Sequence, residues 1–74
     1  MKLHLEKNNK NVKQWIVFYG GNEFQITKYK NVEGIMDNQS FFLYKKTGYK
    51  TFEGCNPYKH KNLIDAKNSI KLQN

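Results

Sequence analysis

The sequence predicts a small α+β domain, in which an antiparallel sheet of about four to five strands carries one C-terminal helix on one face. Two runs rich in β-branched and aromatic residues, each interrupted by a glycine-containing turn, predict two hairpins in that sheet. One amphipathic stretch near the C-terminus predicts the helix. A chain of 74 residues has the length of one domain with a small core, so residues 1–74 are expected to form a single unit.

The N-terminal half contains an expected edge strand and the first hairpin. Residues Lys2–Glu6 alternate polar and apolar side chains, and the cluster Asn8–Asn11 predicts a turn after them. Two β-rich runs then flank the Gly-Gly-Asn sequence at 20–22, which accepts the positive φ angles of a tight hairpin turn. Ile16 and Phe18 fall on one face of this hairpin, half exposed or covered by another element. The period of two places the expected core residues on the other face: Trp15, Val17, Tyr19, Phe24 and Ile26.

The second hairpin is predicted within residues 41–52, with a two-residue turn at Thr47-Gly48. This turn would place Leu43 opposite Phe52 and Tyr44 opposite Thr51. Because both faces are apolar, the reverse assignment of the two faces stays open. We expect one face to lie under the helix with Phe41, Leu43 and Phe52, and the other to be left uncovered with Phe42, Tyr44, Lys46 and Tyr49.

The remaining segments are two irregular connections and the helix. Asn31–Gln39 contains residues that break regular structure, and Gly54–Lys61 is interrupted by Pro57. Asn62 is a suitable cap for a helix over Leu63–Leu72. Its apolar residues share one helical face, with Ile64 beside them: Leu63, Ala66 and Ile70. One helix covers one sheet face, so the other face is open to water, to a partner or to a second copy of the chain.

The charge of the chain favours an anionic partner. The chain contains thirteen lysines, no arginine and six acidic residues, which gives a formal net charge of +7. Such a charge is typical of proteins that bind nucleic acid, an anionic membrane or an acidic protein. Without arginine, bidentate reading of guanine edges by arginine is excluded, and lysine acts on phosphate as a point charge. Ten Asn and a single Ala also fit coding in an AT-rich genome, so the lysine excess has a mutational explanation as well.

Aromatic and lysine side chains gather in the second hairpin and just before the helix. An open sheet face of this composition can stack bases and neutralise phosphates. Lys28 and Lys30 could extend the basic surface, and His60 lies between two lysines before the helix. The alternative is a solvated lysine surface with structural tyrosines whose hydroxyls reach water. The candidate nucleic-acid or partner-binding residues are Phe42, Tyr44, Lys45, Lys46, Tyr49, Lys50, Lys59 and Lys61.

Catalytic and metal-binding motifs are not expected. The glycines at 20 and 21 lack the strand-to-helix context of a phosphate loop, and the carboxylates form no recognisable acid–base pair. Cys55 and His60 lack an orienting or oxyanion motif, and with His4 they give too few ligands for a metal. We therefore expect no enzyme, no cofactor and no metal. We expect a cytoplasmic protein, because the sequence has one cysteine, no signal peptide and no apolar run long enough to span a membrane.

The sequence FFLYKKTGYKTF at 41–52, followed by LIDAKNSI at 63–70, resembles the small sheet-plus-helix modules at the N-termini of phage and transposon integrases. The resemblance covers about the last two thirds of the chain, and Cys55–Lys61 and the lack of arginine depart from the family pattern. In that family a three-stranded sheet lies against a C-terminal helix and enters the DNA major groove. The resemblance implies that the residues facing DNA would be Tyr44, Lys46, Tyr49 and Lys50.

A second interpretation comes from the size and composition of the chain. A very small domain of AT-rich composition without enzymatic motifs resembles accessory proteins of phages and mobile elements. Such a protein would act in the host cytoplasm by binding and inhibiting a host or defence protein, for example a CRISPR effector, or a protein–nucleic-acid complex. Exposed aromatic side chains would then be anchors in a protein interface. A homodimer, formed through Lys2–Glu6 or the open sheet face, is a third possibility.

Overall fold

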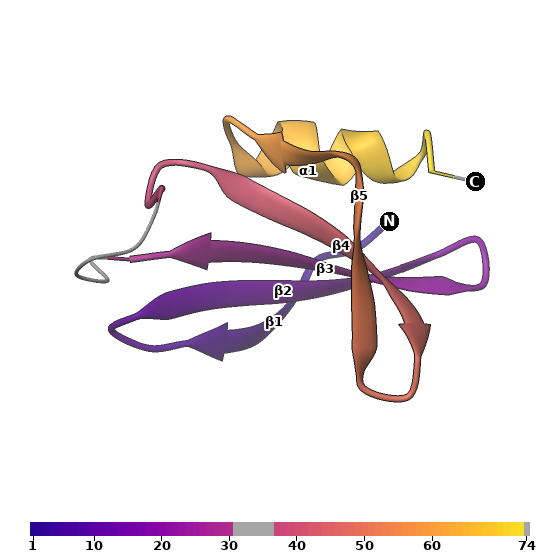
Figure 1. Cartoon of the computed structure of the whole chain (residues 1–74), viewed down its shortest axis with the longest axis horizontal. Helices are drawn as coiled ribbons and strands as arrows, with labels where there is room; N and C mark the ends of the chain where they lie inside the picture. Colours follow the sequence, from indigo (N-terminus) through magenta and orange to yellow (C-terminus); the bar gives the residue numbers. More distant parts are fainter. Residues whose placement is uncertain (31–36, 74) are drawn as a thin grey trace.

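The computed structural model describes residues 1–30 and 37–73 and confirms the predicted fold class. Five strands form one sheet in the order β1-β2-β3-β4-β5, and each strand is antiparallel to its neighbours. One helix, α1, packs on one face of this sheet (Figure 1). The elements are β1 (His4–Asn8), β2 (Val12–Tyr19), β3 (Asn22–Tyr29), β4 (Phe41–Gly48), β5 (Thr51–His60) and α1 (Leu63–Ile70).

The first hairpin forms as the sequence predicts. Gly20 and Gly21 have φ angles of 60° and 79°, the combination that a type I′ turn requires at both central positions. Tyr19 therefore pairs with Asn22, and the expected core face packs against α1. The buried residues of this core are Trp15, Val17, Phe24, Ile26, Leu43, Cys55, Ala66 and Ile70, with Leu3, Tyr19, Phe41 and Leu63 packed at its margin.

The N-terminal strand lies two residues further along than predicted. Strand β1 covers His4–Asn8, and β2 already begins at Val12. The predicted turn between them is present, because the Asn9 side-chain oxygen accepts from the backbone N–H groups of Asn11 and Val12 at 2.9 and 3.0 Å. Of the loop predicted at Asn31–Gln39, residues 31–36 lie outside the described residues, and residues 37–39 have no regular structure.

The helix begins where the sequence predicts and ends two residues earlier. The side chain of Asn62 accepts a hydrogen bond from the backbone N–H of Asp65 at 2.8 Å, which caps the first turn. Ala66 and Ile70 are fully buried against the sheet. Ile64, predicted beside the apolar face, is instead 68% exposed on the outer side. Within the described residues, no helix has the length and apolar character needed to cross a membrane.

The register of the second hairpin corrects the predicted turn. The turn residues are Tyr49 and Lys50 rather than Thr47-Gly48, and Lys50 has a left-handed φ of 61°. Lys46 pairs with Phe52, and the pairing shifts between Lys46 and Gly48. That shift moves Phe52 off the core face that the simple turn would have given it. Phe52 is more than a third exposed and shares a face with Lys46, not with Leu43.

Strand β5 runs through the segment that was predicted to be irregular. Tyr44 pairs with Gly54, but Phe42 pairs with Lys59, so residues 55–58 form a bulge opposite Leu43. Pro57 is accommodated within this bulge, where no ladder hydrogen bond is required of it. Pairing with β4 resumes at Lys59 and His60, and the chain then continues into α1.

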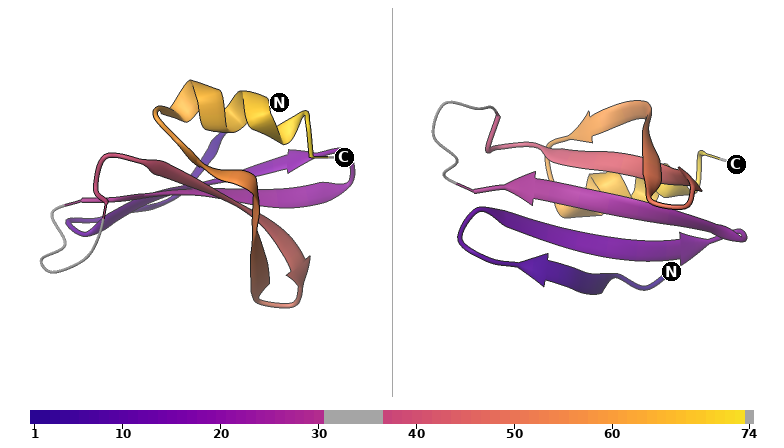
Figure 2. Two further views of the ribbon diagram at one scale, coloured as in Figure 1. Left: turned by 45° about the horizontal axis from the view of Figure 1, so that its top comes forward. Right: turned by 60° about the horizontal axis from the view of Figure 1, so that its bottom comes forward.

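The arrangement leaves one broad face of the sheet uncovered by any described helix or strand (Figures 1 and 2). The far part of the β4–β5 hairpin bends away from α1, and its tip projects beyond the rest of the sheet on the side opposite the helix. We call the sheet surface on that side the open face.

Candidate functional site

The open face carries an aromatic cluster over β3, β4 and β5. The Phe42 ring lies between two tyrosines: its centroid is 6.0 Å from that of Tyr29 and 5.9 Å from that of Tyr58. The Phe42 and Tyr58 planes are inclined by 26°, so these two rings stack. Tyr44 completes the cluster and pairs with Gly54 across the strands. We call Tyr29, Phe42, Tyr44 and Tyr58 the aromatic cluster.

The bulge in β5 is what brings Tyr58 to this face. A Cβ atom on Gly54 would lie 3.6 Å from Cβ and Cγ of Tyr58, so the tyrosine packs directly over the glycine. Because Tyr58 covers Phe42, the latter is only 8% exposed. The prediction that Phe42 is uncovered is therefore wrong: it supports the site from below, while Tyr58, which is 49% exposed, forms the accessible surface.

The three tyrosines of the aromatic cluster lie close enough to influence one another. The pKa of Tyr44 is raised above its usual value, first by burial and then by the neighbouring Tyr29 and Tyr58 phenols. The Tyr44 hydroxyl is protonated at neutral pH with or without this shift, so it can both donate and accept a hydrogen bond. The cluster therefore offers ring faces together with polar groups.

A row of polar side chains borders the aromatic cluster on β2 and β3. The Gln14 side-chain amide donates to the Thr27 hydroxyl at 3.1 Å, and the Thr27 hydroxyl donates to the side-chain oxygen Oε1 of Gln25 at 3.5 Å. Thr27 is buried, whereas both glutamines are partly exposed. These amides supply donors and acceptors next to the rings, the combination that recognises both the edge and the face of a planar group.

A second apolar area lies across β1 and β2. Phe18 is 60% exposed and meets His4 edge to face, with ring centroids 6.1 Å apart. Ile16, expected to be half exposed or covered, lies between His4 and Gln25 in the sheet and is buried. The period of two already placed Phe18 on this face, but it was not among the predicted site residues. Tyr29 and Tyr58 were also missed, the latter because no local pattern signals the bulge.

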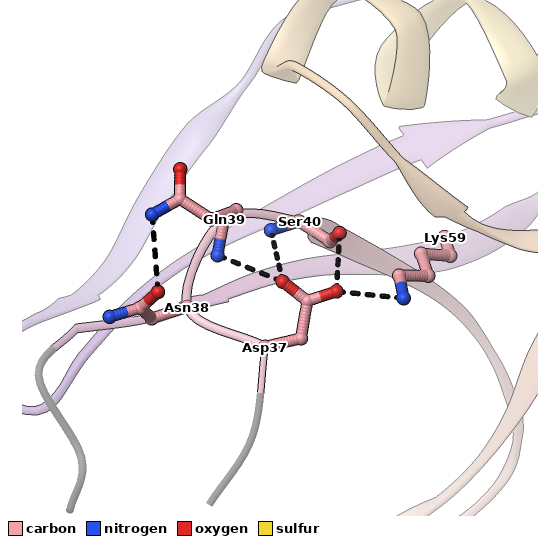
Figure 3. Close-up of polar contacts among 5 residues, drawn as sticks. All are labelled: Asp37, Asn38, Gln39, Ser40 and Lys59. Atoms are coloured by element: carbon pink, nitrogen blue, oxygen red, sulfur yellow. Dashed lines mark hydrogen bonds and ion pairs between the residues drawn. The ribbon is translucent and has the colours of Figure 1, made fainter.

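Two of the predicted lysines are engaged in ion pairs. Lys46 on the open face lies 3.6 Å from a carboxylate oxygen of Glu23. Lys59 lies 2.8 Å from Asp37, whose carboxylate also accepts from Ser40 and from the backbone N–H of Gln39 (Figure 3). The bond from Lys59 is the main cause that holds the pKa of Asp37 far below its usual value, and the same bond raises the pKa of Lys59. This network ties the start of β4 to the end of β5.

The other predicted basic residues separate onto different surfaces. Lys45 pairs with the core residue Phe24, so it lies on the helix side and not beside Tyr44 as predicted. Tyr49 is 82% exposed at the hairpin tip, and the Lys50 ammonium lies 5.3 Å from its ring centroid. Lys61 is exposed in the connection to α1. Of the predicted set, Tyr44 and Lys46 thus share the open face with buried Phe42, Lys59 lies opposite Phe42 on β5, and Tyr49 and Lys50 form the projecting tip.

The cysteine belongs to the core. Cys55 is the first residue of the bulge and is buried in the core on the helix side. Burial raises the pKa of its thiol, which is opposite to the shift that activates a nucleophile. The His60 ring lies 3.2 Å from the Pro57 carbonyl. In the part of the chain that is described, no group of three or more His, Cys, Asp or Glu side chains is arranged to hold a metal ion.

Comparison of the chain with protein-family models, with curated proteins and with solved structures finds no match.

Proposed function

We propose that this protein is a non-enzymatic module that binds single-stranded nucleic acid on the open face. The observation that carries the proposal is the aromatic cluster on a sheet face that no described element covers. Aromatic side chains on an open antiparallel sheet stack unpaired bases, and stacking tolerates any base because each has a π face. Tyr44 and Tyr58 would be the stacking platforms, with Phe18 as a further ring beyond the polar row.

Single strands suit this face better than a duplex. The chain has no arginine with which to read guanine edges in a groove. The glutamines of the polar row can bond to the Watson–Crick edges of bases, which a duplex hides. The net charge of +7 supplies general attraction to phosphates. Integrase modules, which the second hairpin resembles, imply DNA contact by Tyr44, Lys46, Tyr49 and Lys50, which lie on the open face or at its projecting tip.

Fluorescence anisotropy with labelled single-stranded and duplex DNA and RNA, titrated from low to physiological salt, tests the proposal. We expect single strands to bind more tightly, with affinity falling log-linearly as salt rises. Phe18→Ala should weaken binding by roughly 5-fold or more, since a base–aromatic stack is worth about 1–3 kcal/mol. The matched control is Ile64→Ala, which removes a similarly exposed apolar side chain, 68% against 60%, on the helix side. Equal affinity of Phe18→Ala and wild type would exclude stacking on Phe18, and the same result for Tyr58→Ala would reject base stacking on the open face.

One observation favours a second function, the binding of a protein. Lys46 and Lys59, the predicted lysines nearest the aromatic cluster, are already neutralised by Glu23 and Asp37. A face of partly exposed tyrosines with little free charge also suits a protein interface. The partner would be a host or defence protein, inhibited by an accessory protein of a phage or mobile element, or a second copy of this chain. Binding that hardly changes with salt yet is lost in Phe18→Ala would identify this case, and the solution mass would reveal a dimer.

A further inference from the structure

Two lysines face each other on the helix side of the sheet. Lys13 on β2 and Lys28 on β3 are directly opposite cross-strand partners. Each lies two residues from a core residue, Trp15 and Ile26 respectively, so both side chains are on the face that α1 partly covers. Like charges placed directly opposite each other in a sheet repel and destabilise it. By itself this pairing therefore lowers the stability of the sheet.

Neighbouring aromatic rings hold both ammonium groups in place. The Lys13 ammonium lies 5.3 Å from the Trp15 ring centroid, and the Lys28 ammonium lies 5.3 Å from that of Phe41. The two rings are themselves in contact, with centroids 6.0 Å apart. Lys28 also donates to the backbone carbonyl of Asn38 at 2.6 Å. The negative ring faces offset part of the repulsion between the two ammonium groups.

Acidic side chains do not neutralise this pair within residues 1–30 and 37–73. The two ion pairs of the described residues are those of Lys46 and Lys59. Asp37, the acid next to Asn38 in the chain, is bound to Lys59 and Ser40. Lys30, at the same end of the sheet, donates to Asn8 and Asn9. The pair of Lys13 and Lys28 thus presents two positive charges for an anion.

We propose that Lys13 and Lys28 form a phosphate-binding site. Residues opposite each other on neighbouring strands have Cβ atoms about 5 Å apart, so two flexible lysines can place their ammonium groups on one tetrahedral oxyanion. Lysine binds phosphate as a point charge and needs no planar geometry. The ligand chemistry is a phosphate ester, which a free nucleotide or a nucleic-acid backbone can supply. The site is on the other side of the sheet from the open face and does not depend on the function proposed there.

Trp15 provides a built-in reporter, because it is the only tryptophan and lies against Lys13. The experiment follows its fluorescence while tripolyphosphate, a nucleoside triphosphate, or a short 5′-phosphorylated single strand is added at constant ionic strength. We expect a saturable change. Response to all three would identify phosphate groups in general as ligands, and response to the strand alone would identify phosphates of a nucleic-acid strand.

The decisive variant is Lys28→Gln, because the Lys28 ammonium lies against Phe41 and not against the Trp15 ring itself. We expect Lys28→Gln to weaken the apparent affinity for phosphate at least tenfold. Lys13→Gln should weaken it equally, and its affinity is measured by calorimetry because Lys13 lies against the Trp15 reporter. Lys50→Gln is the matched control: it removes an equal charge from a lysine that also lies 5.3 Å from a ring, but at the hairpin tip with no opposing lysine. Circular dichroism checks that each variant is folded.

Lys50→Gln should bind tripolyphosphate within about twofold of wild type, and so should Phe18→Ala, which changes only the open face. Absence of a saturable response in the wild type, or an equal loss in Lys28→Gln and Lys50→Gln, would overturn the proposal, because the effect would then follow net charge alone. Failure of strand binding on the open face would leave the tripolyphosphate result unaffected, so the two proposals can fail separately.

Discussion

The ring of Tyr58 stacks on the ring of Phe42, with centroids 5.9 Å apart and an angle of 26° between the planes. These residues lie on neighbouring strands, and they meet because β5 bulges at residues 55–58. The contact turns Phe42 from a surface residue into a small second core on the open face, and it leaves Tyr58 as the accessible ring.

The first prediction concerns this second core. Phe42→Ala should lower the free energy of unfolding by about 3 kcal/mol, as expected for a phenylalanine removed from a packed site. Tyr49→Ala should change it by less than about 0.5 kcal/mol, since the tip residue has few contacts. Urea unfolding of both variants measures the difference. If Phe42→Ala does not fold, Phe42→Leu should still be measurably less stable than wild type; equal stability of Phe42→Leu and Tyr49→Ala would contradict the burial of Phe42.

The second prediction uses adjacent lysines that lie on opposite faces. Lys46→Gln should weaken binding of single strands, because it removes a charge from the open face and leaves Glu23 without its partner. Lys45→Gln removes the same charge from the helix side and should change affinity much less. Anisotropy titrations over a range of salt measure both affinities. Identical effects of the two substitutions would place the strand elsewhere.

The third prediction follows from the lowered pKa of Asp37. Its folded carboxyl releases the proton more readily than the unfolded one, whose ordinary value is 3.8, so stability from this group is fully present above that pH. It is lost as the pH falls below that value and the carboxyl takes up a proton. The difference in unfolding free energy between wild type and Asp37→Asn should therefore shrink from pH 5 to pH 2.

Unfolding curves at several pH values provide the measurement for Asp37. Lys59→Gln serves as a control, because it removes the largest cause of the lowered Asp37 pKa but keeps the bonds from Ser40 and Gln39. The unfolding free energy of Lys59→Gln should therefore still fall between pH 5 and pH 2, but by less than that of wild type. A difference between wild type and Asp37→Asn that stays constant down to pH 2 would show that the network in Figure 3 does not persist in solution.

The fourth prediction concerns the helix cap. Asn62→Ala removes the acceptor for the Asp65 N–H and should cost about 1 kcal/mol of stability. Asn62→Asp should restore most of that loss, because aspartate caps equally well. Thermal unfolding followed by far-ultraviolet circular dichroism gives both values. A cap variant as stable as wild type would mean that packing of Ala66 and Ile70 alone maintains the helix.

The sequence predicts most of the fold because its strongest signals are local. Two positive φ angles at Gly20 and Gly21 determine the first hairpin, and the period of two then assigns its core face without further information. The capping Asn62 and the spacing of Ala66 and Ile70 similarly specify the helix and its buried side. In each case the residues that determine the structure are within a few positions of one another.

The site depends on register, which a local pattern does not determine in the second hairpin. The shift at Thr47 places Phe52 on the open face, and the bulge after Gly54 carries Tyr58 over Phe42. Lys46 and Lys59 form ion pairs with Glu23 and Asp37, which are distant from them in the chain. The sequence by itself therefore determined the strands, the helix and one core face. Only the tertiary structure decided which rings and lysines remain accessible, because each extra residue in a strand reverses the face of all that follow.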